Sequence, residues 1–377
     1  MTSALLNYKW LNRPMTTPQK KILIYRLGSL GDTVIALPAF HKIHNTFQDA
    51  DITLLTNHPI NTKAAPLESI LGNGYFFHRV INYPIGTRNP LLLLKLIKEI
   101  RELNIDILIY LISTRRLKTT WATKISILRD KWFFKAAGVK RIVGIPNSKE
   151  ELDVCIDTNT GRYEWEAKRL MRRLESLGTV TIETNNYWDL RFTDEELVAA
   201  NKALSPCSSK KSIMAVCTGT QRQSNDWGEA NWLKLFQQLK ITLSDWQLVF
   251  VGANEDLDRA NKCLHIWGGE GINLCGLISP RVSGIILKRA AIFIGHDSGP
   301  MHLAACVGIP CVAIFSARNL PGQWYPRGNF NKVIYHKTDC AGCGLEVCVE
   351  QKKKCILSIT VNEVQNAIME ILARNQA

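Results

Sequence analysis

The sequence predicts an α/β protein made of two doubly wound domains with parallel sheets, which face each other across a central cleft. Three observations support this fold class. Short runs rich in Val, Ile and Leu alternate with amphipathic stretches, as in parallel strands covered by helices on both faces. With 377 residues, the chain is long enough for two such domains. A glycine-bearing loop follows an expected strand in each half of the chain.

Strands and helices are expected in alternation along both halves. Strand-like runs bounded by turn residues cover 21–27, 51–56, 79–84, 105–112 and 140–146, and then 212–219, 246–253, 272–276, 292–297 and 310–316. Helices are expected over 32–47, 89–103, 164–177 and 360–374 and between the later strands. The leucine-rich stretch 90–112 is interrupted by charges at helical spacing, so we interpret it as an amphipathic helix followed by a buried strand.

The strand–helix pattern is weakest between 181 and 212, so we place the domain boundary there. The expected units are a loose N-terminal extension, a first domain, a linker, a second domain and a C-terminal helix that could pack back on the first domain. Their bounds are 1–20, 21–190, 191–211, 212–358 and 359–377.

Composition narrows the choice of partners and compartment. The formal net charge of +14 favours anionic partners, and because no nucleic-acid-binding motif is visible, nucleic acid is not expected among them. Eleven cysteines without a signal-peptide pattern or an uninterrupted apolar run of about 18 residues indicate a reducing cytoplasm. The charge also favours peripheral attachment to the anionic inner face of the cytoplasmic membrane.

The stretch "IFIGHDSGPMHLAACVGIPCVAIFS" predicts a strand, a helix and a second strand. Asp297 and Ser298 can cap the helix and Pro300 suits its first turn. Small residues at a helix start let an anion approach the backbone N–H groups, so this turn is a candidate phosphate site. A second loop, "RLGSLGD", places Asp32 at another helix start, where it could be a cap or a general base.

Two long segments, "ILIYRLGSLGDTVIALPAF" and "FIGHDSGPMHLAACVGIPCVAIFSARNLPGQWYP", resemble glycosyltransferase family 9, the ADP-heptose:lipopolysaccharide heptosyltransferases. The resemblance implies the GT-B architecture, with two Rossmann-like domains that bind the acceptor and the donor respectively. It also implies transfer of a heptose from ADP-heptose to the inner core of lipopolysaccharide, with inversion and with no cofactor required for catalysis. Alternatives are another nucleotide sugar or acceptor, a sugar-nucleotide epimerase of related architecture, or a non-catalytic binding protein.

The resemblance assigns roles to particular residues. Asp32 matches the catalytic base, and Asp297, Ser298, Gly299 and His302 fall on the donor-binding motif. We expect Gly299 to let the donor diphosphate approach the helix closely.

Further donor contacts are expected after two other strands of the second domain. Thr218 and Thr220 lie in a turn suited to phosphate, and Glu255 is chosen for the ribose, although a capped helix start is an equal alternative for this carboxylate. The family usually has a lysine where this chain has Asn225. Arg222 or Arg318 could supply the missing charge, and Asp226 is expected to point away from the phosphates.

The acceptor site is expected in the first domain, at Gly31, Arg115, Arg116 and Lys118. Guanidinium groups suit the phosphates and carboxylates of a lipopolysaccharide core or lipid A, although such a basic run could equally be a solvated face. Four cysteines, Cys340, Cys343, Cys348 and Cys355, could hold a structural zinc or iron ion or could be reduced packing residues.

Overall fold

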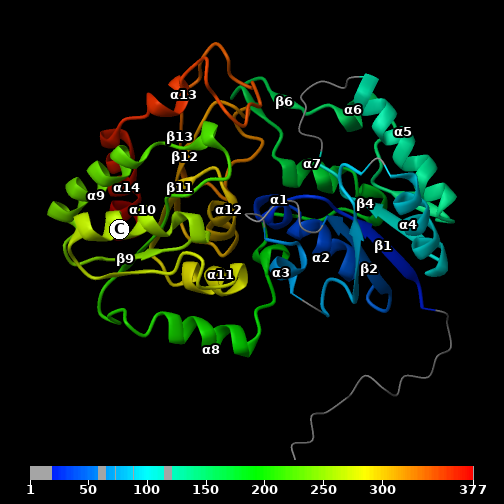
Figure 1. Ribbon diagram of the computed structural model, residues 1–377, viewed down its shortest axis with the longest axis horizontal. Coiled ribbons are helices and arrows are strands. Elements are labelled where there is room, and N and C mark those ends of the chain that lie inside the picture. The colour runs from blue at the N-terminus through cyan, green and yellow to red at the C-terminus, as the bar shows by residue number, and fades with distance from the viewer. Residues whose placement is uncertain (1–18, 58–64, 73, 88, 114–120, 377) are drawn as a thin grey trace, which may run out of the picture.

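A computed structural model describes residues 19–57, 65–72, 74–87, 89–113 and 121–376 of the chain. It has two lobes, each built around a parallel sheet with helices on both faces, and the chain passes from the first lobe to the second near residue 190 (Figure 1). The α/β fold class predicted from the sequence is confirmed. None of the described helices is both long and apolar enough to span a bilayer.

The first lobe contains a five-stranded parallel sheet in the order β3-β2-β1-β4-β5. Its strands are β1 (Lys21–Tyr25), β2 (Asp51–Asn57), β3 (Arg79–Tyr83), β4 (Ile107–Tyr110) and β5 (Arg141–Val143). Its helices are α1 (Leu30–Ile35), α2 (Leu37–Thr46), α3 (Glu68–Leu71), α4 (Pro90–Glu102), α5 (Trp121–Ala136), α6 (Lys149–Leu152) and α7 (Glu166–Arg172). A short antiparallel hairpin, β6 (Ile156–Asp157) and β7 (Arg162–Tyr163), precedes α7.

The second lobe contains a six-stranded parallel sheet in the order β10-β9-β8-β11-β12-β13. Its strands are β8 (Ile213–Cys217), β9 (Gln247–Phe250), β10 (Gly271–Asn273), β11 (Ile292–His296), β12 (Cys311–Phe315) and β13 (Lys332–Tyr335). The helices from the linker onward are α8 (Asp194–Ala203), α9 (Glu229–Thr242), α10 (Leu257–Trp267), α11 (Pro280–Lys288), α12 (Gly299–Cys306), α13 (Lys354–Leu357) and α14 (Val361–Gln376).

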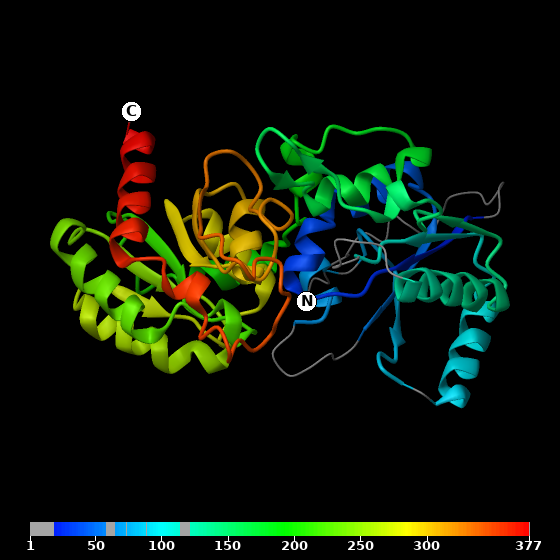
Figure 2. The same ribbon diagram turned by 90° about the horizontal axis from the view of Figure 1, so that it is seen from above.

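Two local expectations differ from the structure. The helix expected over 32–47 is divided into α1 and α2 at Ala36, because Pro38 in the first turn of α2 has no N–H to continue the hydrogen-bond ladder. The final helix, α14, does not return to the first domain. It packs on α9 and on the second sheet, where Val364, Ile368 and Ile371 join the buried core of that domain (Figure 2).

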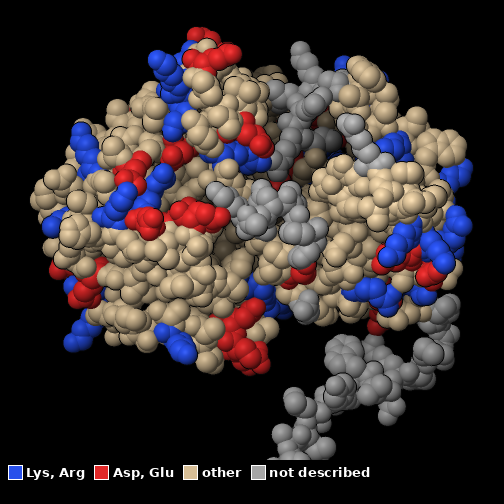
Figure 3. Space-filling view, in the orientation of Figure 1, with Lys and Arg blue, Asp and Glu red and all other residues tan. Residues whose placement is uncertain are grey.

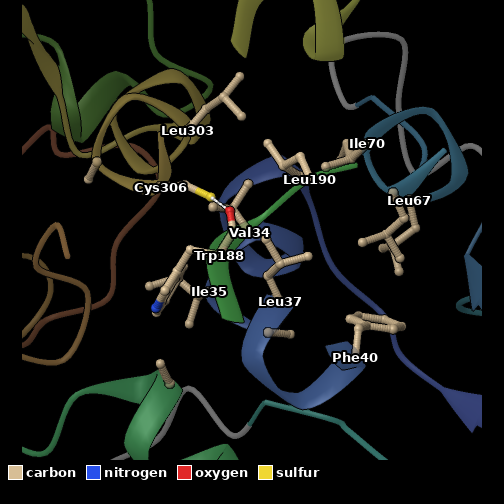
Figure 4. Close-up of a cluster of buried hydrophobic side chains, with 14 of the residues drawn as sticks. Val34, Ile35, Leu37, Phe40, Leu67, Ile70, Trp188, Leu190, Leu303 and Cys306 are labelled. Atoms are coloured by element: carbon tan, nitrogen blue, oxygen red, sulfur yellow. Dashed lines mark hydrogen bonds between the residues drawn. The ribbon is translucent and has the colours of Figure 1, made fainter. Parts of the chain in front are cut away.

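The two lobes share one continuous apolar core at their junction. Val34 and Leu37, from α1 and α2, belong to the same buried cluster as Leu303 of α12 (Figure 4). Trp188, from the segment that connects the lobes, also belongs to it, and the Cys306 thiol donates a hydrogen bond to the Trp188 carbonyl at 3.1 Å. Burial of this shared surface holds α1 and α12 against each other.

A buried arginine reinforces the junction. Arg281 of α11 forms an ion pair with Glu196 of α8, with Nε 2.5 Å from Oε1. The same guanidinium donates hydrogen bonds to the carbonyls of Ile70 at 3.0 Å, Leu190 at 2.8 Å and Arg191 at 2.7 Å. One side chain therefore connects the second lobe, the linker and the first lobe.

Candidate active site

A cavity of about 260 Å³ lies between the lobes, at the carboxyl ends of β1, β8, β9 and β11. Loops beyond these strand ends form its walls, which is where ligands bind in doubly wound sheets. Its volume is slightly below the range usual for small-molecule sites, roughly 300–1,000 Å³. Both glycine-bearing loops singled out in the sequence contribute to the lining.

Asp32 is a buried carboxylate on the first-lobe wall of the cavity. It occupies the third position of α1, and its Oδ2 accepts hydrogen bonds from the backbone N–H of Ser29 at 2.9 Å and from the Ser29 hydroxyl at 2.8 Å. The capping interpretation of this residue therefore has a geometric basis. It does not exclude a chemical role, because the same residue lines the cavity.

Arg26 holds the first turn of α1, which carries Asp32, in place. This buried guanidinium donates to the Asp32 carbonyl, to the Leu111 carbonyl at 2.5 Å and to the Ser113 hydroxyl at 2.7 Å. The contacts connect the ends of β1 and β4 with the first turn of α1. They restrict the position of the first turn of α1.

The N-terminal turns of α1 and α12 meet at two glycines. A Cβ atom at Gly31 would lie 2.7 Å from Cδ2 of His302, and one at Gly299 would lie 2.7 Å from the Leu30 side chain. Both distances are shorter than real contacts allow, so glycine is required here for the approach of the two helices. Close approach of a phosphate to Gly299 stays a prediction; packing against Leu30 is a further physical reason for glycine at this position.

Asp297, Ser298, Gly299 and His302 all line the second-lobe wall of the cavity. Asp297 is held in place by Asn319, whose amide donates to Oδ2 at 2.9 Å, and its Oδ1 lies 3.8 Å from Nε2 of His302. The first turn of α12 offers backbone N–H groups with no partner inside the helix, except at Pro300, which has no N–H. The partial positive charge of this helix end faces the site.

The other expected donor residues divide into two groups. Thr220, Arg222 and Glu255 line the cavity. Thr218 does not: its side chain is buried at the end of β8, and its carbonyl accepts a hydrogen bond from Arg259 at 3.0 Å. Arg222 lies at the cavity edge, with its Nε 3.5 Å from Oε1 of Glu346.

Asn225, which stands where the family usually has lysine, is part of the structural framework and not of the cavity wall. It is buried, its amide donates to the Asp297 carbonyl at 3.3 Å, and its Oδ1 accepts from the Ser316 hydroxyl at 2.6 Å. Asp226 is likewise outside the lining and pairs with Arg259 at 2.8 Å. Asp226 therefore faces Arg259 and not the cavity.

A buried histidine supports the same loop. His296 accepts a hydrogen bond from the Trp227 N–H through Nε2 at 3.1 Å, and its Nδ1 lies 3.3 Å from the Gly219 carbonyl. Burial lowers the pKa of His296 to about 4. The ring is therefore neutral at pH 7, with a protonated Nδ1 that can donate to Gly219.

Asp256, Asn319 and Trp324 are among the cavity-lining residues to which the sequence analysis assigned no role. Asp256 lies against Gly219 and Gly252, where a Cβ atom would come within 2.0 and 2.6 Å of its carboxylate, and its Oδ2 accepts from the Ala253 N–H at 2.9 Å. Asn319 and Trp324 complete the wall near Asp297 and His302. All three lie in segments where donor contacts were expected, and Asp256 is next to Glu255, the residue expected to bind the ribose. Only the fold shows that these three side chains line the cavity.

Two further sets of residues were predicted from the sequence. Arg115, Arg116 and Lys118 lie outside the described residues. In the part of the chain that the structure describes, no three His, Cys, Asp or Glu side chains are arranged to hold a metal ion. Of the four candidate cysteines, Cys343 is exposed, Cys340 is half-buried, and Cys348 and Cys355 are buried.

Two parallel-sheet domains with one shared cavity at their strand ends define the GT-B class of glycosyltransferase architecture. The pattern of glycosyltransferase family 9 (heptosyltransferase) matches residues 133–354, which is more than half of the chain. The chain belongs to this family and is a glycosyltransferase of the heptosyltransferase type.

Similar proteins cover almost the whole chain. A lipooligosaccharide heptosyltransferase 2 from Campylobacter jejuni is 23% identical over 351 residues, which are 91% of this chain and 96% of that protein. The crystal structure of a family 9 glycosyltransferase from Veillonella parvula has a TM-score of 0.67 at 17% identity, covering 94% of this chain and 98% of the other. The structure of the ADP-heptose lipopolysaccharide heptosyltransferase II from E. coli has a TM-score of 0.63 at 18% identity, covering 95% and 100%.

Proposed function

We propose that this enzyme transfers a heptose from ADP-heptose to the inner core of lipopolysaccharide, with inversion at the anomeric carbon and without a metal cofactor. One observation carries the proposal: the first turns of α1 and α12 meet at one cavity, with Asp32 on one wall and the start of α12 on the other. The donor and acceptor classes are those named for the similar proteins from E. coli and C. jejuni.

In this mechanism Asp32 removes the proton from the acceptor hydroxyl. The hydroxyl oxygen attacks the anomeric carbon on the face opposite to the leaving ADP, which gives inversion. The bonds of Ser29 to Oδ2 and of Arg26 to the Asp32 carbonyl keep the carboxylate in position. Correct placement of a base contributes to rate because no reorganisation is needed during the reaction.

Negative charge develops on the diphosphate as the sugar leaves. The start of α12 and Arg222 line the cavity, and we propose that their N–H groups stabilise that charge, with Ser298 and Thr220 as hydroxyl donors. Glu255 and Asp256 lie at the end of β9, where a carboxylate can accept hydrogen bonds from ribose hydroxyls. We propose Asp297 and His302 as contacts to the sugar or the diphosphate.

For the acceptor we propose the first lobe, with Gly31 at the cavity wall and Arg115, Arg116 and Lys118 as partners for anionic groups of the core or lipid A. The acceptor domain would span 21–190 and the donor domain 212–358. Such an acceptor lies at a membrane, so we also propose that the enzyme works at the inner face of the cytoplasmic membrane.

A second candidate function is transfer of another sugar from a nucleotide donor. Asn225 favours it, because this residue carries no charge and faces Ser316 and the Asp297 carbonyl, away from the cavity. A site that lacks the lysine would bind the diphosphate mainly through Arg222 and α12. The identity of the sugar then depends on the contacts of Asp297 and its neighbours.

A donor panel tests the function directly. With ADP-heptose and a lipopolysaccharide truncated before its heptoses, we expect ADP release only when the acceptor is present and a product heavier by one heptose in intact-mass analysis. Product formation with another nucleotide sugar but not with ADP-heptose would favour the second candidate. Conversion of ADP-heptose to an isomer without acceptor would contradict both.

Arg222→Gln is expected to weaken ADP binding by about tenfold or more, because a charge-assisted hydrogen bond is worth about 1.5–3 kcal/mol. Calorimetric titration with ADP measures this. Glu346→Gln is the matched control: it removes the carboxylate that faces Arg222, so ADP should bind as well as before or more tightly. Equal affinities in the wild type and in Arg222→Gln would remove Arg222 from the donor site.

A further inference from the structure

We propose that one face of α5 is a docking surface for an anionic lipid bilayer. The apolar side chains of this face would insert into the bilayer at the level of the headgroups. The surface consists of Trp121, Ile125, Leu128 and Trp132, here called the α5 stripe. This proposal goes beyond the transfer reaction, and it does not rest on the assignment of the donor or the acceptor.

The α5 stripe is apolar, continuous and exposed. Its members follow each other at intervals of four, three and four residues, which places them in one line along a helix. Their exposed fractions are 76% for Trp121, 53% for Ile125, 54% for Leu128 and 63% for Trp132. An ordinary core-facing helix buries such a line of residues, so this one is presented to a partner.

The opposite face of α5 fixes the rotation of the helix. Ile127 and Phe134 are buried in the core of the first lobe. Asp130 is also buried and accepts a hydrogen bond from the Tyr110 hydroxyl at 2.7 Å. The helix is therefore anchored by its inner side, and the α5 stripe cannot turn inward without breaking these contacts.

Charge selects a bilayer with anionic lipids as the partner. Lys124, Arg129, Lys131 and Lys135 are the basic residues of α5, and Asp130, its one acidic residue, is buried and hydrogen-bonded to Arg129. By helical geometry the three lysines lie along one side of the α5 stripe and Arg129 along the other. The ammonium group of Lys135 lies 5.4 Å from the centre of the Trp132 ring.

An apolar line that contains two tryptophans and has basic side chains beside it is the pattern of an interfacial helix. Trp side chains favour the headgroup region, and each Lys or Arg near an anionic surface adds attraction. The net charge of +14 by itself does not locate such a surface, because basic and acidic side chains are interspersed over both lobes on the face seen in Figure 3. The α5 stripe does.

The position of α5 in the fold is compatible with docking. It lies with α4 at the end of the first lobe that faces away from the second lobe (Figures 1 and 2). Leu91, Leu92 and Leu94 of α4 are exposed as well, so the neighbouring helix adds apolar surface to this end of the molecule. Neither helix contributes a residue to the cavity lining.

Co-sedimentation of the full chain with vesicles tests the proposal. The probe is a set of phosphatidylglycerol/phosphatidylethanolamine vesicles, compared with pure phosphatidylcholine vesicles. We expect binding to the anionic vesicles that falls as salt rises, and a loss of about tenfold or more for Trp121→Ser combined with Trp132→Ser, since both rings leave water on docking. Lys131→Gln combined with Lys135→Gln should weaken binding to anionic vesicles only.

The matched control is Val198→Ser combined with Ile241→Ser, which removes two apolar side chains that are 65% and 80% exposed on other helices. This variant should bind vesicles like the wild type. Equal binding by the tryptophan variant and the control would overturn the proposal. The proposal would also be overturned if the wild type does not bind anionic vesicles and sediments as a dimer, whereas the tryptophan variant sediments as a monomer. The α5 stripe would then join two copies of the chain.

Activity separates this proposal from the transfer reaction. With a detergent-free, lipid-lacking core oligosaccharide as acceptor, the tryptophan variant should turn over at the wild-type rate. Vesicle binding is measured without any sugar substrate, so an inactive wild type that still binds anionic vesicles would count against the proposed function alone.

Discussion

Asp32→Asn is expected to slow sugar transfer by about 10²–10⁴-fold, the usual contribution of a general base. The amide oxygen of asparagine can still accept the bond from the Ser29 N–H, so the first turn of α1 and the fold should be retained. ADP binding should change little, because the diphosphate is proposed to lie against α12 on the other wall. Single-turnover rates and ADP titrations measure the two effects separately.

Ser29→Ala provides the control for this prediction. It removes the hydroxyl bond to Oδ2 at 2.8 Å but leaves the carboxylate in the cavity. We expect a modest loss of stability, about 0.5–2 kcal/mol for a lost cap contact, and at most a small effect on turnover. If Asp32→Asn turns over at a near-normal rate while both variants lose similar stability, Asp32 is a capping residue only.

Arg281→Met is expected to reduce the free energy of unfolding by about 3–5 kcal/mol. The substitution leaves the Glu196 carboxylate without its partner and three backbone carbonyls without a donor. Equilibrium urea unfolding, followed by circular dichroism, measures the change. Because this guanidinium joins both lobes and the linker, its loss should let the lobes separate more readily. The variant should therefore also bind ADP less tightly.

Arg289→Met, at the opposite end of α11, is the control. Arg289 is exposed and donates to the Asn201 side chain at 2.6 Å, so its loss should change stability by no more than about 0.5 kcal/mol. Removing both members of the ion pair, with Glu196→Gln added to Arg281→Met, should cost less than the sum of the single changes. A loss below about 1 kcal/mol for Arg281→Met would contradict the proposed role.

Local pattern was enough to predict most of the secondary structure that positions the site. The strands that end at the cavity, β1, β8, β9 and β11, are short apolar runs bounded by turn residues, and each was expected within a few residues of its observed bounds. The misses have local causes or lie at the periphery. Pro38 divides the expected helix, β13 is a half-buried edge strand of four residues, and α8 is a polar helix inside the expected linker.

By itself, the sequence determined the fold class, the family and the two loops that flank the cavity, because strand–helix alternation and glycine-bearing turns are local properties of the chain. Only the tertiary structure decided which residues of those loops reach the cavity. Thr218 is buried in the core, and Asp256 lines the cavity beside Glu255. Asn225 is buried and forms hydrogen bonds within the domain. These outcomes depend on contacts between segments far apart in the chain, such as the 2.6 Å bond between Asn225 and Ser316, which no local pattern contains. Tertiary packing also decided which side of α5 faces the solvent: Ile127, Asp130 and Phe134 are buried in the first lobe, and the α5 stripe lies on the other side of the helix.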